Sequence, residues 1–194
     1  MPELPEVETV CRGLAPCLTG RRLARVTVRR AGLRLPFPDR MAERLTGRVV
    51  MMVARRAKYI LFHLDDGEVV IAHLGMSGRM VISGPGAPPP GKHDHVVLET
   101  DDGAVVTFND ARRFGLMIMT GAAGLAGHPL LADLGPEPLE RDFTPALLSC
   151  ALAGRKSAIK LALLDQTVVA GLGNIPRLRR AAKNGACMVI REGF

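Results

Sequence analysis

Short runs of β-branched and apolar residues dominate the chain between residues 21 and 120, and this pattern limits the possible folds more than any other feature. The runs cover residues 23–28, 49–54, 59–64, 69–73, 80–83, 96–100, 104–108 and 116–119. Two Asp-Asp-Gly strings, residues 65–67 and 101–103, separate four of these runs and are typical of hairpin turns. Many short strands at close spacing predict a β-sandwich or barrel.

A helix is expected before the first strand. After Pro5, the apolar residues Val7, Val10, Cys11 and Leu14 have the i, i+3, i+4, i+7 spacing of an amphipathic helix with proline in its first turn. The beginning of the chain is therefore expected at the start of a packed helix.

Glycine and proline mark the places where the composition changes. Residues 83–92 are rich in both and predict a long loop. A second glycine-rich stretch, residues 121–127, precedes a segment of helical composition. Helices are expected over 143–153 and 157–164, with Thr144 and Pro145 at the start of the first. The sequence thus predicts an α+β protein with one domain over residues 1–120 and another over residues 121–194.

The charge balance favours a polyanionic partner. The chain has 26 Lys and Arg against 19 Asp and Glu, a formal charge of +7 and a pI near 9.8. Such a balance suits contacts with phosphates. A basic protein with no nucleic-acid role fits the charge equally well.

The remaining composition bears on location and metal binding. No apolar run approaches the ~20 residues that span a bilayer, and the acidic, proline-broken start does not resemble a signal peptide, so no membrane association and a cytoplasmic location are expected. The cysteines, Cys11, Cys17, Cys150 and Cys187, show no CxxC spacing. Neither a metal site nor a disulfide framework is predicted.

Pro2 becomes a secondary amine when Met1 is removed. A terminal amine has a pKa of about 8, against about 10.4 for lysine, so more of it is unprotonated at neutral pH and able to attack carbon. Glu3 adjoins it and Glu6 follows one helical turn later, so that one carboxylate is available to move protons while the other stays ionised. Acidic residues at a helix start are also ordinary capping, and for an arbitrary protein that interpretation is favoured.

Several strings in a fixed order shift the interpretation towards chemistry. They are Met1-Pro2-Glu3-Leu4-Pro5-Glu6-Val7-Glu8-Thr9-Val10, Arg55-Arg56-Ala57-Lys58-Tyr59, His73-Leu74-Gly75-Met76-Ser77-Gly78, Lys92-His93-Asp94-His95, Asn109-Asp110-Ala111-Arg112-Arg113-Phe114-Gly115, Leu134-Gly135-Pro136-Glu137-Pro138-Leu139 and Gly171-Leu172-Gly173-Asn174-Ile175. Together they resemble the bacterial formamidopyrimidine-DNA glycosylase family, bifunctional enzymes of oxidised-purine repair. The resemblance extends from residue 1 to about residue 175.

The resemblance implies catalytic roles at the matching positions. Pro2 would form a Schiff base at C1′ of the damaged nucleotide, and Glu3 would be the acid of that step. Glu6 would support the same site. Lys58 would help the β-elimination that breaks the strand, although without the resemblance it is an ordinary solvated lysine at a strand end.

Met76, Arg112 and Phe114 are implied to enter the duplex where the damaged base is flipped out. An apolar wedge fills the gap in the stack, and arginine can hydrogen-bond the orphaned base. By residue type alone, Met76 and Phe114 would be core residues and Arg112 a surface charge. The adjoining glycines and turn-like strings favour exposed loop tips.

Phosphate contacts are implied for three further residues, His93, Lys156 and Asn174. Asn174 would act from a helix-two-turn-helix element, in which Gly171 and Gly173 allow tight turns and backbone amides face a phosphate. A simple glycine turn between packed helices is an equally good interpretation of the local sequence.

The resemblance stops abruptly at about residue 176. Where the family continues with further helices and a zinc finger containing two CxxC pairs, this chain has Pro176-Arg177-Leu178-Arg179-Arg180 and an unrelated basic tail. We therefore expect a truncated helix-two-turn-helix domain, no zinc and no other cofactor. We also expect the apolar faces of Leu161 to Leu164 and of Val168-Val169 to lack their usual cover. A frameshift, a truncation and a sequencing error are the hypotheses for the change, and the reading frames of the coding DNA test the first.

Three functions are consistent with these features. The first is a DNA glycosylase and AP lyase that removes 8-oxoguanine and formamidopyrimidines from damaged double-stranded DNA and nicks the strand by β,δ-elimination, acting as a monomer near the nucleoid. The second is a truncated, non-catalytic DNA-binding remnant of the same family. The third is an unrelated enzyme that uses its terminal proline as a base on a small carbonyl acid, but such chemistry needs neither the wedge nor the phosphate-binding strings.

Overall fold

The computed structural model describes residues 2–174, which divide into two compact units, one ending at His128 and the other beginning at Pro129. The division after His128 lies a few residues beyond the predicted boundary near residue 121. Strand β8 (Leu116–Gly121) leads directly into a short 3-10 helix, η1 (Ala122–Gly124). The Ala122 N–H donates to the Gly67 carbonyl at 2.8 Å, which attaches η1 to a hairpin turn of the first unit.

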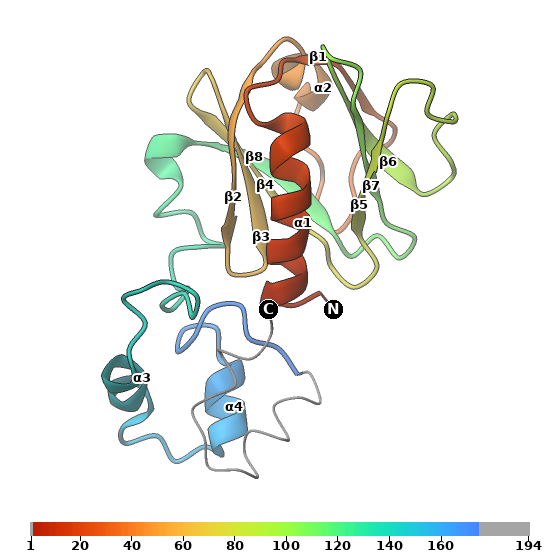
Figure 1. Ribbon diagram of the computed structural model, residues 1–194. Helices are drawn as coiled ribbons and strands as arrows, with labels where there is room; N and C mark the ends of the chain where they lie inside the picture. The colour runs from red at the N-terminus through yellow and green to blue at the C-terminus, as the bar shows by residue number, and fades with distance from the viewer. Residues whose placement is uncertain (1, 175–194) are drawn as a thin grey trace. The chain divides into compact units, whose positions relative to one another are not determined.

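Two antiparallel sheets build the first unit, as the pattern of short strands predicts (Figure 1). One sheet has the order β1-β6-β7-β5, with β1 Leu23–Val28, β6 Asp94–Thr100, β7 Val105–Asn109 and β5 Arg79–Ser83. The other has the order β2-β3-β4-β8, with β2 Val50–Arg56, β3 Tyr59–Leu64 and β4 Glu68–His73. Each predicted Asp-Asp-Gly turn joins two strands that are neighbours in the same sheet. The first turn joins β3 to β4 in one sheet, and the second joins β6 to β7 in the other. Their glycines, Gly67 and Gly103, have φ values of +81° and +90°.

Helix α1 (Leu4–Leu18) packs against β2, β3 and β5, so that it contacts strands of both sheets (Figure 1). Its buried side chains are Leu4, Val7, Cys11, Leu14 and Leu18, which confirms the predicted apolar stripe. They join a core formed from the inner faces of the sheets, where Ile60, Val96 and Phe108 are at most 1% exposed. The start of the chain is thus fixed to the packed core of the unit.

The short helix α2 (Met41–Leu45) is absent from the sequence-based expectations. It buries Met41 and Leu45 in the same core, each 2% exposed. Five residues are too few for a period of 3.6 to show, and the preceding Arg40 adopts a left-handed conformation with φ 53° in place of a usual helix cap. Tertiary packing, not local propensity, stabilises this helix.

The second unit contains helices α3 (Pro145–Leu152) and α4 (Ile159–Leu164), both inside the predicted ranges. The Thr144 hydroxyl accepts a hydrogen bond from the Leu147 N–H at 3.2 Å, as expected of an N-cap. After α4, the Gln166 amide group donates to the Leu172 carbonyl and accepts from the Gly171 N–H, which closes a compact turn.

The cover of the segment after α4 differs from the expectation. Val168 and Val169 are 1% and 0% exposed, so the prediction that they lie uncovered is wrong, whereas Leu161 is 63% exposed, as predicted. Backbone hydrogen bonds from Gly135 to Gln166 and from Ala170 to Pro136 hold the segment around Gly135 against this turn. A Cβ at Gly135 would lie 2.5 Å from the Thr167 carbonyl oxygen, which shows how closely the two backbones approach.

Within residues 2–174, no helix has the length and apolar character needed to cross a membrane. The predicted divergent tail, including Cys187, lies outside the described residues.

Candidate active site and nucleic-acid interface

The N-terminal segment combines helix capping with a cluster of carboxylates. Pro2 is half-buried and immediately precedes Glu3, the N-cap residue of α1. The Glu3 N–H donates to a carboxylate oxygen of Glu6 at 3.0 Å. Glu6 therefore caps the helix and, by the same bond, stays close to Glu3. The capping interpretation and the proximity of the two carboxylates are both correct.

Lys58 lies in the two-residue turn between β2 and β3, and only 7% of it is exposed. It is not the solvated lysine that its local sequence favours. Burial lowers the pKa of the Lys58 ammonium, while the negative charge of Glu3 acts in the opposite direction. A lowered pKa increases the fraction of neutral amine available to accept a proton.

The Glu3 carboxyl responds to the same neighbours. Burial raises its pKa above the usual value, the Lys58 ammonium opposes that shift, and the Glu6 carboxylate adds to it. A raised pKa favours the protonated form that a general acid needs. The fold thus brings Lys58, which is distant in the sequence, close to Glu3 and its neighbour Glu6 at the chain end that carries Pro2.

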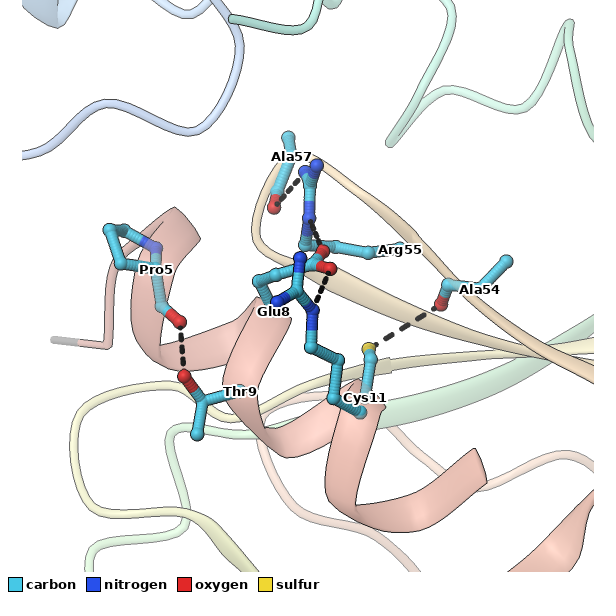
Figure 2. Close-up of polar contacts among 8 residues, drawn as sticks. Pro5, Glu8, Thr9, Cys11, Ala54, Arg55 and Ala57 are labelled. Carbon is cyan, nitrogen blue, oxygen red and sulfur yellow. Dashed lines mark hydrogen bonds and ion pairs between the residues drawn. The ribbon is translucent and has the colours of Figure 1, made fainter. Parts of the chain in front are cut away.

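A buried ion pair fixes the turn that carries Lys58 (Figure 2). The Arg55 guanidinium donates to the Glu8 carboxylate at 2.8 Å through Nε and to the Ala57 carbonyl at 3.1 Å through Nη1. The Arg55 side chain is 6% exposed, and Glu8 also accepts from Arg12 at 2.8 Å. Although burial alone raises the pKa of Glu8, the hydrogen bonds from Arg55 and Arg12 hold it below its usual value.

The turn needs such support because Ala57 has a φ of 52°, a conformation that residues with a Cβ rarely adopt. Ala57 is 1% exposed, so its backbone is constrained on all sides. Sequence reasoning missed Glu8 and Arg55 as members of this site. Both stand in strings used for the resemblance, but only the fold reveals that their side chains meet.

His73 is a further buried residue near this site that sequence reasoning missed. It ends β4, pairs with Tyr59 in the sheet, and its ring centroid lies 5.1 Å from that of Tyr59. Its Nδ1 accepts the Gly75 N–H at 3.0 Å. Burial lowers the pKa of His73 to about 4, aided by the positive charges of Arg34 and Lys58. The ring is therefore neutral at pH 7.

The three residues expected to enter DNA lie on two neighbouring loops. Met76 follows β4, whereas Arg112 and Phe114 lie between β7 and β8. Met76 is 47% exposed and Phe114 45%, and the Arg112 guanidinium carbon lies 4.8 Å from the centroid of the Phe114 ring. Met76 and Phe114 are therefore exposed loop residues and not core residues. We call Met76, Arg112 and Phe114 the wedge triad.

The expected phosphate-binding residues lie in both units. His93 is half-buried in the first unit, before β6. Lys156 and Asn174 are exposed residues of the second unit. The Gly171 N–H is already bonded to Gln166, so this amide is not directed at a phosphate. The helix expected after Asn174 lies outside the described residues.

No group of three or more His, Cys, Asp or Glu residues within the described range is arranged to hold a metal ion. Cys11, Cys17 and Cys150 are free thiols. The Cys11 thiol is buried against the Ala54 carbonyl at 3.6 Å, and burial raises its pKa to about 12 (Figure 2). It is therefore a packing residue and not a reactive thiol.

Comparisons with known proteins agree with both units. Residues 1–117 match the family model of the formamidopyrimidine-DNA glycosylase N-terminal domain, and residues 134–177 match that of the formamidopyrimidine-DNA glycosylase H2TH domain. The chain is 58% identical over 182 residues to the formamidopyrimidine-DNA glycosylase of Cereibacter sphaeroides strain ATCC 17029, and 59% identical over 182 residues to that of Jannaschia sp. strain CCS1. Each alignment covers 90% of this chain and 64% of the relative, so the chain spans about two thirds of the relatives' length.

A solved structure shows the same architecture. The crystal structure of Lactococcus lactis formamidopyrimidine-DNA glycosylase bound non-covalently to DNA containing an AP site matches with a TM-score of 0.79 and 34% sequence identity. The match covers 90% of this chain and 66% of that protein. A second structure of the Lactococcus lactis protein, in complex with DNA containing an abasic site, has the same TM-score and identity.

Proposed function

Because the chain belongs to the formamidopyrimidine-DNA glycosylase family, whose N-terminal domain model matches residues 1–117 of its 194, we propose that it removes oxidised purines from duplex DNA and cuts the strand at the resulting site. The substrates are 8-oxoguanine and formamidopyrimidines. The single observation that carries the proposal is the meeting of Glu3, with a raised pKa, and buried Lys58, with a lowered pKa, beside Pro2.

The glycosylase step needs a nucleophile and an acid. Once Met1 is removed, the lone pair of the Pro2 nitrogen forms a bond to C1′ of the nucleotide. The bond between C1′ and the base breaks, and its electron pair leaves with the base, which takes up a proton. Protonated Glu3 supplies a proton to the sugar or base in this step, a role that suits its raised pKa. The Pro2 nitrogen then loses its proton, and the C1′–O4′ bond breaks as O4′ takes up a proton. The product is an iminium cation between Pro2 and the opened sugar.

The lyase step removes a proton from C2′ and expels the 3′ phosphate, and a second elimination releases the 5′ phosphate to complete the β,δ-elimination. The iminium cation accepts electrons from the breaking C2′–H bond, which makes that proton acidic. We propose that Lys58 assists this elimination and approaches the phosphate. Because burial lowers the pKa of Lys58, a larger fraction of this amine is neutral and able to accept a proton than in an exposed lysine.

The proposed partner is damaged double-stranded DNA. The formal charge of +7 suits a polyanion, and the exposed wedge triad suits insertion between base pairs. We propose that His93, Lys156 and Asn174 contact phosphates. The related Lactococcus lactis protein has been crystallised with DNA containing an AP site. A monomeric state and a location at the cytoplasmic nucleoid stay predictions.

Borohydride trapping tests the proposal. The purified chain is incubated with a duplex containing an abasic site or 8-oxoguanine, the imine is reduced, and peptide mass mapping locates the sugar. We expect a covalent complex whose adduct lies on residue 2. Pro2→Gly should lose most of it. A matched control carries an uncleaved N-terminal extension, which blocks the amine without changing any side chain.

The outcomes separate the possible functions. An adduct on Pro2 that the extension abolishes supports the glycosylase and lyase. DNA binding without an adduct would instead make the chain a non-catalytic DNA-binding member of the family. An adduct on Lys58 would contradict the role of Pro2 while preserving the site. Absence of both binding and adduct would overturn the proposed function.

A further inference from the structure

We propose that Asp110 is a positioning residue that holds the wedge triad in the shape that DNA meets. This inference rests on the proposed function, because it concerns how the exposed triad enters a duplex. Asp110 is 0% exposed, so its side chain offers no surface to DNA. It acts through the two loops that carry the triad.

The Asp110 carboxylate connects these loops directly. One oxygen, Oδ1, accepts the Ser77 hydroxyl at 2.6 Å and the Arg112 N–H at 3.2 Å. The other, Oδ2, accepts the Gly115 N–H at 2.8 Å. Ser77 adjoins Met76, while Arg112 and Gly115 enclose Phe114. The carboxylate therefore bonds beside every member of the triad.

A second bond closes the link between the loops. The Arg112 N–H also donates to the Ser77 hydroxyl oxygen at 3.1 Å. Ser77, Asp110 and Arg112 thus form a closed triangle of hydrogen bonds between the β4–β5 loop and the β7–β8 loop. Such a closed arrangement fixes two loop backbones with a single side chain at its centre.

The backbones of the two loops also approach too closely to allow side chains between them. Gly75 has a φ of +63°, and a Cβ there would lie 2.4 Å from the carbonyl carbon of Phe114. A Cβ at Gly115 would lie 2.6 Å from the Phe108 ring and 3.1 Å from Asp110 Oδ2. The carboxylate thus lies in a space that the glycines keep open and that water has little room to enter.

The backbone of Asp110 extends the network to a third segment. Its N–H donates to the His93 carbonyl at 2.9 Å. Its carbonyl oxygen lies 2.8 Å from Nε2 of His95, which is 2% exposed. His93, a proposed phosphate contact, is therefore held by the same residue as the wedge triad.

Chemistry explains why a carboxylate is needed at this point. All three groups that face Asp110 are donors, a hydroxyl and two N–H groups, and a carboxylate is an acceptor only. Asparagine has the same shape, but its NH₂ group would face a donor. At least one donor would then be buried without a partner, which is costly enough to open the loops.

The Asp110 hydrogen bonds lower the conformational entropy that the wedge triad would lose on binding DNA. Exposed Met and Phe side chains on free loops would sample many conformations, and binding would have to order them first. Fixed loops remove that cost before the DNA arrives. We therefore expect the loss of the Asp110 network to weaken the interaction with duplex DNA and to leave the reaction at Pro2 intact.

The test compares Asp110→Asn and Ser77→Ala with Asp102→Asn. Asp102 is a matched control because its carboxylate also accepts a hydrogen bond from a hydroxyl, that of Thr100 at 2.6 Å. This bond lies in a hairpin turn outside the β4–β5 and β7–β8 loops, which we call the wedge loops. Ser77→Ala removes one donor and is the milder variant, useful if Asp110→Asn fails to fold. Hydrogen exchange and strand cleavage are measured for all of them.

Hydrogen exchange tests the positioning without any DNA. In Asp110→Asn and Ser77→Ala, the amides of Arg112 and Gly115 should exchange about tenfold faster or more, while the β3 and β4 amides keep their protection. Asp102→Asn should change neither set. Unchanged exchange at Arg112 and Gly115 would overturn the inference, even if the wild-type chain proved inactive.

Strand cleavage tests the consequence for DNA. With an abasic site in a duplex, KM should rise about tenfold in Asp110→Asn. With the same site in a single-stranded oligonucleotide, which has no base stack to enter, kcat and KM should match the wild type. Equal losses on both substrates would show a general structural defect and contradict positioning. A wild type that forms no borohydride adduct would refute the proposed function. The exchange experiment would still test whether Asp110 holds the two loops in place.

Discussion

The Lys58 turn and the wedge loops belong to the same sandwich but bury opposite kinds of groups. At the turn, the functional amine is 7% exposed, and the pair that supports it, Arg55 and Glu8, is also largely shielded. At the loops, the functional side chains are exposed, with Phe114 at 45%, and only the supporting Asp110 is fully buried.

The difference follows from the work each region does. Proton transfer at neutral pH needs a lysine and a carboxyl whose pKa values are moved away from their usual values, and burial provides that shift. Insertion into a base stack needs apolar surface that stays in water until DNA arrives. The functional group is therefore the buried one at the Lys58 turn and the exposed one at the wedge loops.

Removing the Lys58 amine should give the largest effect. Lys58→Met is expected to lower the strand-cleavage rate by roughly 10²- to 10⁴-fold, the usual range for a group that moves protons. The loss should be equal on single-stranded and duplex abasic DNA. Thermal unfolding should not occur earlier, because methionine replaces a buried charge with an apolar chain.

The control for this substitution is Lys160→Met, at an exposed lysine of α4, which removes the same charge. If both variants slow cleavage equally, net charge and not the buried amine determines the rate. The Lys58 turn would then not depend on a buried functional group, in contradiction to the contrast with the wedge loops.

Acid should weaken both regions through His73, which contacts Tyr59 next to Lys58 and accepts the Gly75 N–H next to Met76. The folded-state pKa is about 4 against an ordinary 6.5, so the unfolded chain binds the proton first as pH falls. Stability is then lost from about pH 6.5 downwards, and the loss is complete below about pH 4.

We expect His73 alone to lower the free energy of unfolding by about 2 kcal/mol between pH 7 and pH 4.5. Urea unfolding of the wild type and of His73→Asn, which keeps an acceptor but does not titrate, measures the difference. An identical pH dependence in the two proteins would contradict the lowered pKa.

Breaking the Arg55 pair should affect the Lys58 turn and spare the wedge loops. Arg55→Met removes the buried donor to Glu8, whose other donor is the exposed Arg12, and one donor to the Ala57 carbonyl, which should cost about 1–3 kcal/mol in the free energy of unfolding. The single-strand cleavage rate should fall about tenfold, because the turn that carries Lys58 loses its support.

Arg12→Met removes the other partner of Glu8 and is the matched control. The Arg12 side chain is 62% exposed, so the change in the free energy of unfolding should stay within about 0.5 kcal/mol. A larger loss in the free energy of unfolding for Arg12→Met than for Arg55→Met would contradict this prediction. It would show that Glu8 stabilises helix α1 through Arg12 more than it stabilises the turn through Arg55.

Truncation of the wedge should have the smallest effect. Phe114→Ala and Met76→Ala should leave the free energy of unfolding within about 0.5 kcal/mol, since both side chains are nearly half exposed. Duplex affinity for an abasic site should fall by about 1 kcal/mol, roughly fivefold. Fluorescence anisotropy measures it, and Met51→Ala, at a 57% exposed methionine of β2, is the control.

The sequence predicts the sandwich well because alternation and turn chemistry act locally. The Asp-Asp-Gly turns specify two hairpins, and the stripe from Val7 to Leu14 specifies α1. Helix α2 was missed because its stability comes from Met41 and Leu45 inserting into a core that no local pattern reveals. The first unit extends to His128, and contacts that hold this extension, such as that of Ala122 with Gly67, join residues far apart in the sequence.

Some residues of the candidate site could be identified from the sequence, and others only from the fold. The resemblance identified Pro2, Glu3 and Lys58 as candidates, and the fold brings the latter two together. Glu8 and Arg55 were missed because their contact joins residues 47 positions apart. Asp110 was missed because an aspartate in a turn-like string is normally solvated. In each case the missing information is the burial of a polar side chain, which depends on distant partners.

The packing of α1 also has a consequence for the order of events during synthesis. The helix is made first, but the strands that cover its apolar face end as late as Ser83. At about 5–20 residues per second, Val7, Leu14 and Leu18 remain in water for roughly 4–16 s before β5 is complete. The segment that carries the proposed nucleophile is therefore open to processing enzymes and chaperones during this interval.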